Sequence, residues 1–91
     1  MPLRMTWSVA PIASASGNVD DIEGALEAFD RSVLRILDDF QVVTGVRAAA
    51  LRGSARIMRE RMLSEGRAAV GRGVRWTARV GEVEVTLTPE R

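Results

Sequence analysis

The longest periodic pattern in the chain lies in residues 19–43, where apolar residues recur at spacings of four and three. These spacings are those of an a/d seam, which is typical of a helix packed lengthwise on another helix. Asn18 is placed to cap such a helix, and the acidic residues that follow it suit the first turn. We therefore predict a helix over residues 19–43. Its apolar positions are Ile22, Leu26, Phe29, Val33, Ile36, Phe40 and Val43.

A second helix is predicted over residues 46–70, after a break at Gly45. Gly45 suits the left-handed position that ends a helix, and Val46 would then fold back on Phe40. Because one glycine is a weak stop, a closed helical hairpin and a long bent rod exchanged between chains both remain open. The apolar stripe of the second helix consists mostly of small or flexible side chains and is interrupted at Glu65. Its members are Ala48, Leu51, Ala55, Met58, Met62 and Ala69.

Alternation of apolar and polar residues predicts a strand over residues 3–10. Pro11 ends this strand, because proline cannot continue a ladder of backbone hydrogen bonds. The following residues, Ala13 to Gly17, are small and are predicted to form a loop. The apolar face of the strand carries Leu3, Met5, Trp7 and Val9.

A β-hairpin is predicted over residues 74–88, which alternate on both sides of Gly81-Glu82. This two-residue loop fits a type II′ turn, which requires glycine first. The turn places Arg79 opposite Glu84, and Thr77 opposite Thr86.

Together these elements predict an α+β fold in the order β-α-α-β-β, formed by residues 1–91 as one domain. A long helical hairpin covers one face of a small three-stranded antiparallel sheet. The short first strand lies at an edge of this sheet, where it can accept a strand from another chain.

Charge is divided between the two helices. Residues 19–43 hold seven acidic residues and two arginines, whereas residues 44–79 hold nine arginines and two glutamates. In an antiparallel hairpin this predicts contacts between the helices, although exposed ion pairs contribute only about 0–1 kcal/mol each. The expected contacts are Asp30 with Arg59, Glu23 with Arg67, and Asp38 and Asp39 with Arg47 and Arg52.

The residues that are missing exclude most catalytic chemistry. The chain has no Cys, His, Lys or Tyr, so it holds no Ser-His triad and no Cys or Lys nucleophile. The neighbouring carboxylates of Asp20 and Asp21 diverge on a helix, so they do not converge on one cation. We expect no catalytic, metal or cofactor site, and hence no enzyme.

The main functional prediction is a structural module that self-associates or docks on another protein through helix faces or an edge strand. Ile57 and Leu63 lie off the apolar stripe of the second helix, so we predict an interface formed by Ile57, Leu63, Met58 and Met62. The alternative is an arginine-based nucleic-acid-binding module. Its contacts to a polyanion would be Arg52, Arg56, Arg59 and Arg67.

The predicted order of elements, and nothing more specific, is similar to that of two families. Small toxin ribonucleases have such an order, and so do phage head–tail connector subunits that form rings. The resemblance implies RNA cleavage in the first case and ring assembly in the second, and no residue is carried over from either.

We expect a cytoplasmic protein, because no apolar run reaches the 18 residues of a membrane helix. The competing interpretation is a secretion signal that ends at Ala13-Ser14-Ala15, after the short apolar stretch from Met5. Thr6, Ser8 and Pro11 interrupt that stretch, which favours a strand.

Overall fold

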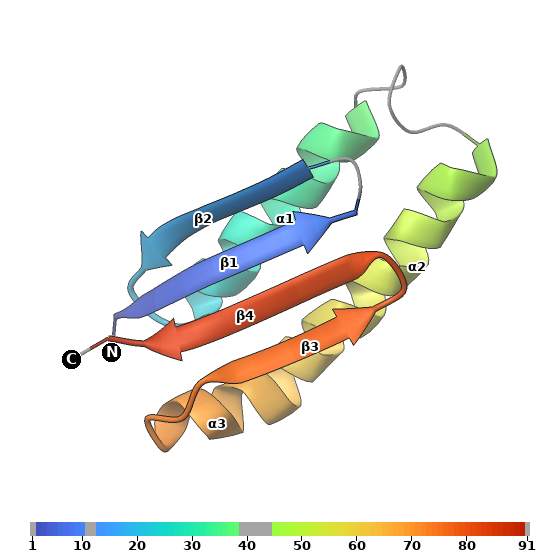
Figure 1. The fold of residues 1–91 in the computed structure, drawn as a ribbon. Coiled ribbons are helices and arrows are strands. Elements are labelled where there is room, and N and C mark those ends of the chain that lie inside the picture. Colours follow the sequence, from blue (N-terminus) through green and yellow to red (C-terminus); the bar gives the residue numbers. More distant parts are fainter. Residues whose placement is uncertain (1, 11–12, 39–44, 91) are drawn as a thin grey trace.

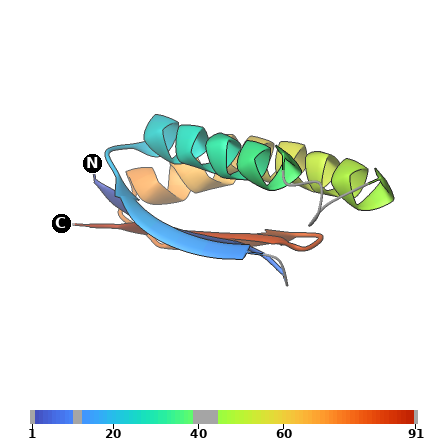
Figure 2. The ribbon, with the colours of Figure 1, turned by 90° about the horizontal axis from the view of Figure 1, so that it is seen from above.

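The computed structural model describes residues 2–10, 13–38 and 45–90 of the chain. The strands form one antiparallel sheet in the order β2-β1-β4-β3, and the helices cover one face of it (Figures 1 and 2). The α+β class is therefore confirmed, with four strands rather than the predicted three. In chain order the elements are β1 (Leu3–Val9), β2 (Ala13–Val19), α1 (Ile22–Asp38), α2 (Gly45–Arg61), the π-helical turn η1 (Met62–Gly66), α3 (Arg67–Gly71), β3 (Trp76–Val80) and β4 (Val83–Pro89).

The additional strand is β2, which the sequence predicted as a loop. It pairs with β1 along its whole length, with Trp7 opposite Ala15 and Met5 opposite Gly17. The prediction of β1 as an edge strand is therefore wrong, because β1 lies between β2 and β4. Leu3 and Met5 of β1 are fully buried, as expected for a central strand.

Helix α1 begins at Ile22, and its cap differs from the predicted one. The carboxylate Oδ1 of Asp21 accepts a hydrogen bond of 2.8 Å from the backbone N–H of Gly24. This is the bond that an N-cap side chain makes to the third helical residue. Asn18 cannot fill that role because it belongs to β2.

The apolar stripe of α1 is buried from Ile22 to Val33, but it does not pack on a second helix alone. Helix α1 contacts β1 and β2 as well as α2 and η1. Phe29 is fully buried in this core, and Ile36 packs against it from a half-buried position. The predicted helix positions Phe40 and Val43 lie outside the described residues.

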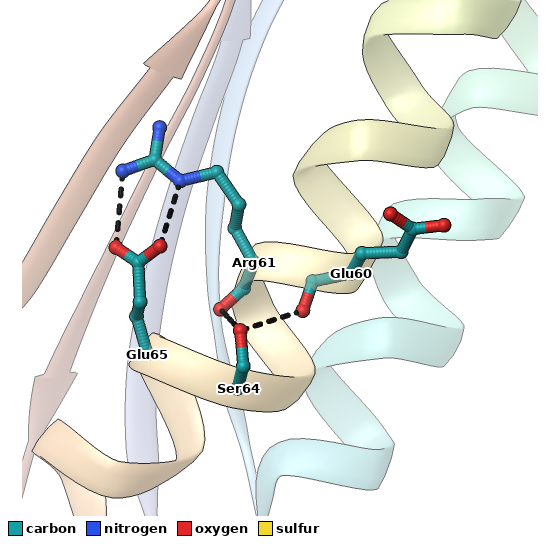
Figure 3. A network of polar contacts seen from close by, with 4 residues as sticks. All are labelled: Glu60, Arg61, Ser64 and Glu65. Atoms are coloured by element: carbon teal, nitrogen blue, oxygen red, sulfur yellow. Dashed lines mark hydrogen bonds and ion pairs between the residues drawn. The ribbon is translucent and has the colours of Figure 1, made fainter.

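The second helical region runs from α2 through η1 to α3, and all six residues of its predicted stripe are buried. The interruption predicted at Glu65 corresponds to η1, which fits one extra residue into the turn. The hydroxyl of Ser64 donates to the carbonyl oxygen of Glu60 at 3.0 Å, and so supplies a partner to the helix backbone beside the π-turn (Figure 3). Gly66 lies against the indole of Trp76, so a Cβ at this position would lie 3.2 Å from Cε3 of the ring and would require the ring to shift by a few tenths of an ångström.

The β3–β4 hairpin has the predicted turn and register. Gly81 has φ of +59° and Glu82 does not have a positive φ, as a type II′ turn requires. Arg79 lies opposite Glu84 with an ion pair of 3.5 Å. The second predicted pair is also present, because the hydroxyl oxygens of Thr77 and Thr86 are 3.1 Å apart.

Helices α1 and α2 run in opposite directions on the same face of the sheet (Figure 1). This arrangement is the closed helical hairpin rather than the long bent rod. Two of the predicted contacts of α1 are present: Arg59 Nε of α2 lies 3.3 Å from Asp30 Oδ2, and Arg67 of α3 pairs with Glu23. Arg47 pairs with Glu82 instead of an acidic residue of α1.

Gly45 has the predicted positive φ, at +56°. Val46 is 88% exposed, so it does not fold back into an apolar contact among the described residues. The predicted partners Phe40 and Asp39 lie outside those residues.

Because β2 adds a strand before the helices, the chain does not have the order β-α-α-β-β. Both family resemblances relied on that order. No helix within residues 2–10, 13–38 and 45–90 has the length and apolar character needed to cross a membrane.

Candidate interaction surfaces

The outer edge of β2 presents backbone groups that pair with no other strand among the described residues. Ala10 N–H donates to the carbonyl of Glu82, and Glu90 N–H donates to the carbonyl of Pro2, each at 3.0 Å. Even-numbered residues of β1 thus bond to β4. Because the backbone N–H and C=O groups of successive residues point to opposite sides of a strand, odd-numbered residues of β1 bond to β2. With the observed register, odd-numbered residues of β2 face β1. The backbone N–H and C=O groups of Ser14, Ser16 and Asn18 therefore point to the open edge.

The β2 edge has none of the usual protection against pairing. Natural edge strands carry charges, proline or bulges, or are very short. β2 has seven residues, ASASGNV, without a charge or a proline and with an unbroken register to β1. The opposite edge, β3, has only five residues and carries Arg79.

The helix layer leaves part of the inner face of β2 uncovered at Ala15 and Gly17, whereas Val19 at the end of the strand packs against the core. Ala15 is exposed, and a Cβ added to Gly17 would have no atom within 4 Å. On the other edge strand, the equivalent inner residues Trp76 and Ala78 are buried beneath the α2–η1–α3 region. The cause is local: the small residues of β2 give α1 little surface to pack on, so the sheet extends past the helix.

Trp7 of β1 lies beside Ala15 and Gly17, and together these three residues form an uncovered strip between the open edge and α1. The indole of Trp7 is half-buried and lines three adjoining hollows beside α1, two of which are also lined by residues of β2. The largest has a volume of about 500 Å³. The residue paired with Trp7 on β2 is Ala15, which is too small to cover a ring of this size. The strip is therefore an apolar floor with one large aromatic side chain.

The wall of this strip, formed by α1 and the turn before it, has an acidic half and a basic half. Glu27 lines the hollow beside Gly17, Asn18 and Val19, with Asp20 at the same end. Arg35 lines the hollow beside Ser14 and Ala15, and Arg31 lies between the two ends. None of these four charged side chains forms an ion pair with another described residue.

The structure separates the four residues predicted to form an interface. Met58 and Met62 are fully buried in the core, so they are not surface residues. Ile57 and Leu63 are 47% and 40% exposed. At roughly 100° per residue, positions six apart on a helix face about 120° away from each other. Ile57 and Leu63 therefore do not form one continuous patch.

The predicted arginine stripe is also divided. Arg59 and Arg67 are engaged with Asp30 and Glu23 of α1. Arg52 and Arg56 are exposed and form no ion pair within the part of the chain that the structure describes. Only half of the stripe is thus free of internal partners.

The outer face of the sheet carries hydroxyl groups in register. A row across all four strands consists of Ser16, Thr6, Thr86 and Thr77. Short polar side chains of this kind fit a solvated sheet face rather than an apolar contact.

Arg61 and Glu65 form a two-bond polar contact within the helix layer. Arg61 Nε and Nη2 donate to the two carboxylate oxygens of Glu65 at 3.2 and 3.0 Å (Figure 3). The hydrogen bond lowers the pKa of the Glu65 carboxyl and raises the pKa of Arg61. The described residues contain no group of three or more acidic side chains that could hold a metal ion.

Sequence reasoning missed β2, and with it the open edge and the Trp7 strip. A signal was present, because polar and small residues alternate over Ser14, Ala15, Ser16, Gly17 and Asn18. The alternation lacks large apolar residues, which is why it resembled a loop.

Comparison of the chain with protein-family models, with curated proteins and with solved structures found no match. Proposals about function therefore rest on the β2 edge, the strip beside it and the charges of α1.

Proposed function

We propose that this protein is a non-enzymatic structural module that acts by associating with other protein chains, in the first place with copies of itself. The observation that carries the proposal is the open edge of β2. An unprotected edge strand is a template for pairing with another chain, and strand addition is a common mode of protein recognition.

The size of the chain adds support. A chain of 91 residues buries only about 60–65% of its unfolded surface, so its stability margin is thin. Covering Trp7 and the inner face of β2 would remove further apolar surface from water, at roughly 25 cal/mol per Å². Association therefore stabilises a fold that has little core of its own.

The alternative, an arginine-based nucleic-acid-binding module, has weaker support. It requires a row of available arginines, and Arg59 and Arg67 are engaged with α1. It predicts salt-dependent retention on RNA or DNA that is lost when Arg52 and Arg56 become alanine.

We also place the module in the cytoplasm. The support is that residues 3–9, which begin the competing secretion signal, form a strand paired on both sides. A segment cleaved from the chain would take the centre of the sheet with it.

The oligomeric state tests the proposed function. Light scattering coupled to size-exclusion chromatography should give a mass above the 9.9 kDa of one chain, increasing with concentration from the micromolar to the millimolar range. A mass of one chain throughout this range would overturn the proposal.

A further inference from the structure

We propose that the β2 edge is occupied by β2 of a second copy of this chain, paired antiparallel about a two-fold axis at Ser16. This inference rests on the proposed function and specifies its geometry. The product is one continuous eight-stranded sheet with both helix layers on the same side.

The direction of the backbone groups limits the possible registers. Hydrogen-bonded pairs of an antiparallel ladder must join residues whose N–H and C=O groups point at each other. On the open edge these residues are Ser14, Ser16 and Asn18. The register with the longest overlap places Ser16 opposite the partner's Ser16, and Ser14 opposite the partner's Asn18. All seven residues of β2 are then paired.

The inner face of this junction joins two of the smallest side chains. Ala15 lies opposite the partner's Gly17 in a pair without backbone hydrogen bonds, where the strands approach most closely. Because α1 contacts both β1 and β2, the two copies of α1 lie two to three strand spacings apart, or about 10–14 Å. Packed helices are usually about 8–10 Å apart, so long side chains are needed to fill the space. Trp7, Arg31 and Arg35 are available there from each chain.

Under this two-fold symmetry, the charges along the wall of one copy are complementary to the charges along the wall of the partner. Asp20 and Glu27 line the hollow beside the end of β2, Arg35 lines the hollow beside its start, and Arg31 lies between them. Antiparallel pairing brings the acidic half of each wall to the basic half of the partner's wall. Parallel pairing of the same two edges requires a two-fold axis along the strands. The two helix layers would then lie on opposite faces of the sheet, where the charges of one α1 cannot meet those of the other. The charges therefore select a second copy in this orientation.

The opposite edge of the sheet explains why assembly stops at two chains. β3 is short, its inner residues Trp76 and Ala78 are buried, and Arg79 is on the strand itself. A two-fold contact uses the same surface of both chains and closes on itself. Once the two β2 strands are paired, only the protected β3 edges remain.

The first experiment blocks one edge at a time. Ser16→Pro removes an N–H that points to the open edge and leaves the ladder to β1 intact. Thr77→Pro is the matched control, because its backbone points to the open edge of β3 by the same alternation. We expect Ser16→Pro to be a monomer at concentrations where the wild type and Thr77→Pro are dimers, with circular dichroism confirming that each variant folds. A Ser16→Pro protein that dimerises like the wild type would overturn the two-fold pairing.

The second experiment tests the orientation without touching β2. Arg31→Glu with Arg35→Glu makes the whole α1 wall acidic, and Asp20→Arg with Glu27→Arg makes it basic. Each double variant alone should have a dimer dissociation constant raised by at least about tenfold, because like charges now meet at both contacts. An equimolar mixture should form a heterodimer with near-wild-type affinity, seen by native mass spectrometry. A mixture that stays monomeric would exclude the antiparallel arrangement.

These results separate the two proposals. A wild-type chain that is monomeric at every concentration overturns both. A wild type that assembles while Ser16→Pro also assembles overturns only the β2 pairing, and the self-association then uses another surface, such as Ile57 or Leu63.

Discussion

At the scale of single residues, two glycines of the second helical region have opposite surroundings. A Cβ on Gly66 would lie 3.2 Å from Cε3 of Trp76, whereas one on Gly53 would meet nothing within 4 Å. Alanine gains up to about 1 kcal/mol of helix propensity over glycine at either position. Gly66 is thus kept small by the indole, while Gly53 is not constrained by any described neighbour.

We therefore expect Gly53→Ala to raise the free energy of unfolding by about 0.5–1 kcal/mol. Gly66→Ala should be less stable than Gly53→Ala by about 1–2 kcal/mol, because a buried ring must move to accept the methyl group. Chemical denaturation measures both differences. Equal stabilities of the two variants would show that Trp76 moves without cost.

The Arg61–Glu65 pair leads to a prediction about pH. Because Arg61 lowers the pKa of the Glu65 carboxyl, the pair stabilises the folded chain above the ordinary pKa of glutamate. This contribution is lost as the pH falls through the lowered pKa. Both side chains are substantially exposed, so the effect is small.

The measurement is the difference in unfolding free energy between the wild type and Glu65→Gln as a function of pH. It should decrease on acidification and reach its largest value near neutral pH. Glu60→Gln is the neighbouring control, since its carboxylate lies away from Arg61 (Figure 3). A difference that grows as the pH falls would contradict the assigned role of Arg61.

At the scale of elements, the sequence predicted best where several local signals agreed. The β3–β4 hairpin combines alternation, a glycine with the required φ and matched cross-strand pairs, so its turn and register were predicted. β2 has none of these supports, because its small residues bury little, and pairing with β1 alone makes it a strand. The helix prediction was accurate for the stripe from Ile22 to Val33 and for the six stripe residues of the second helical region. It was wrong for the start of α1, where Asp21 rather than Asn18 is the cap.

The candidate site was less predictable than the fold for a related reason. Helical periodicity indicates which residues share a face, but not whether that face meets the sheet or the solvent. Met58 and Met62 were predicted as contacts and are core residues. The acidic character of α1 was likewise interpreted as pairing with α2. The structure pairs Asp30 with Arg59 of α2 and Glu23 with Arg67 of α3, and leaves Glu27 on the side of β2.

The turn of the β3–β4 hairpin gives a prediction at this scale. Gly81 and Gly45 both have a positive φ, but a Cβ on Gly81 would also lie 2.7 Å from the hydroxyl oxygen of Ser54. Gly45→Ala should cost about 1–2 kcal/mol from the backbone alone, and Gly81→Ala should cost more. Combining Gly81→Ala with Ser54→Ala should remove the excess, which a double-mutant cycle by chemical denaturation would detect. Additive effects of these two changes would exclude the contact with Ser54.

At the scale of the whole molecule, the two edges of the sheet differ in length, charge and cover. The helix layer protects the β3 side, and β2 extends beyond it with a half-buried Trp7 beneath. A molecule built in this way has one surface that benefits from a partner and one that does not. The expected assembly is therefore a closed dimer, with Trp7 near its centre.

Trp7 itself can report this assembly, because the chain has only two tryptophans. In Trp76→Phe, Trp7 is the sole indole, and its quenching by acrylamide should decrease as the protein concentration rises through dimerisation. Trp7→Phe, which retains the buried Trp76, should show weak quenching that does not depend on concentration. Adding Ser16→Pro to Trp76→Phe should hold Trp7 at the quenching of the monomer at all concentrations. Quenching of Trp7 that stays constant while the mass doubles would place the dimer contact elsewhere on the molecule.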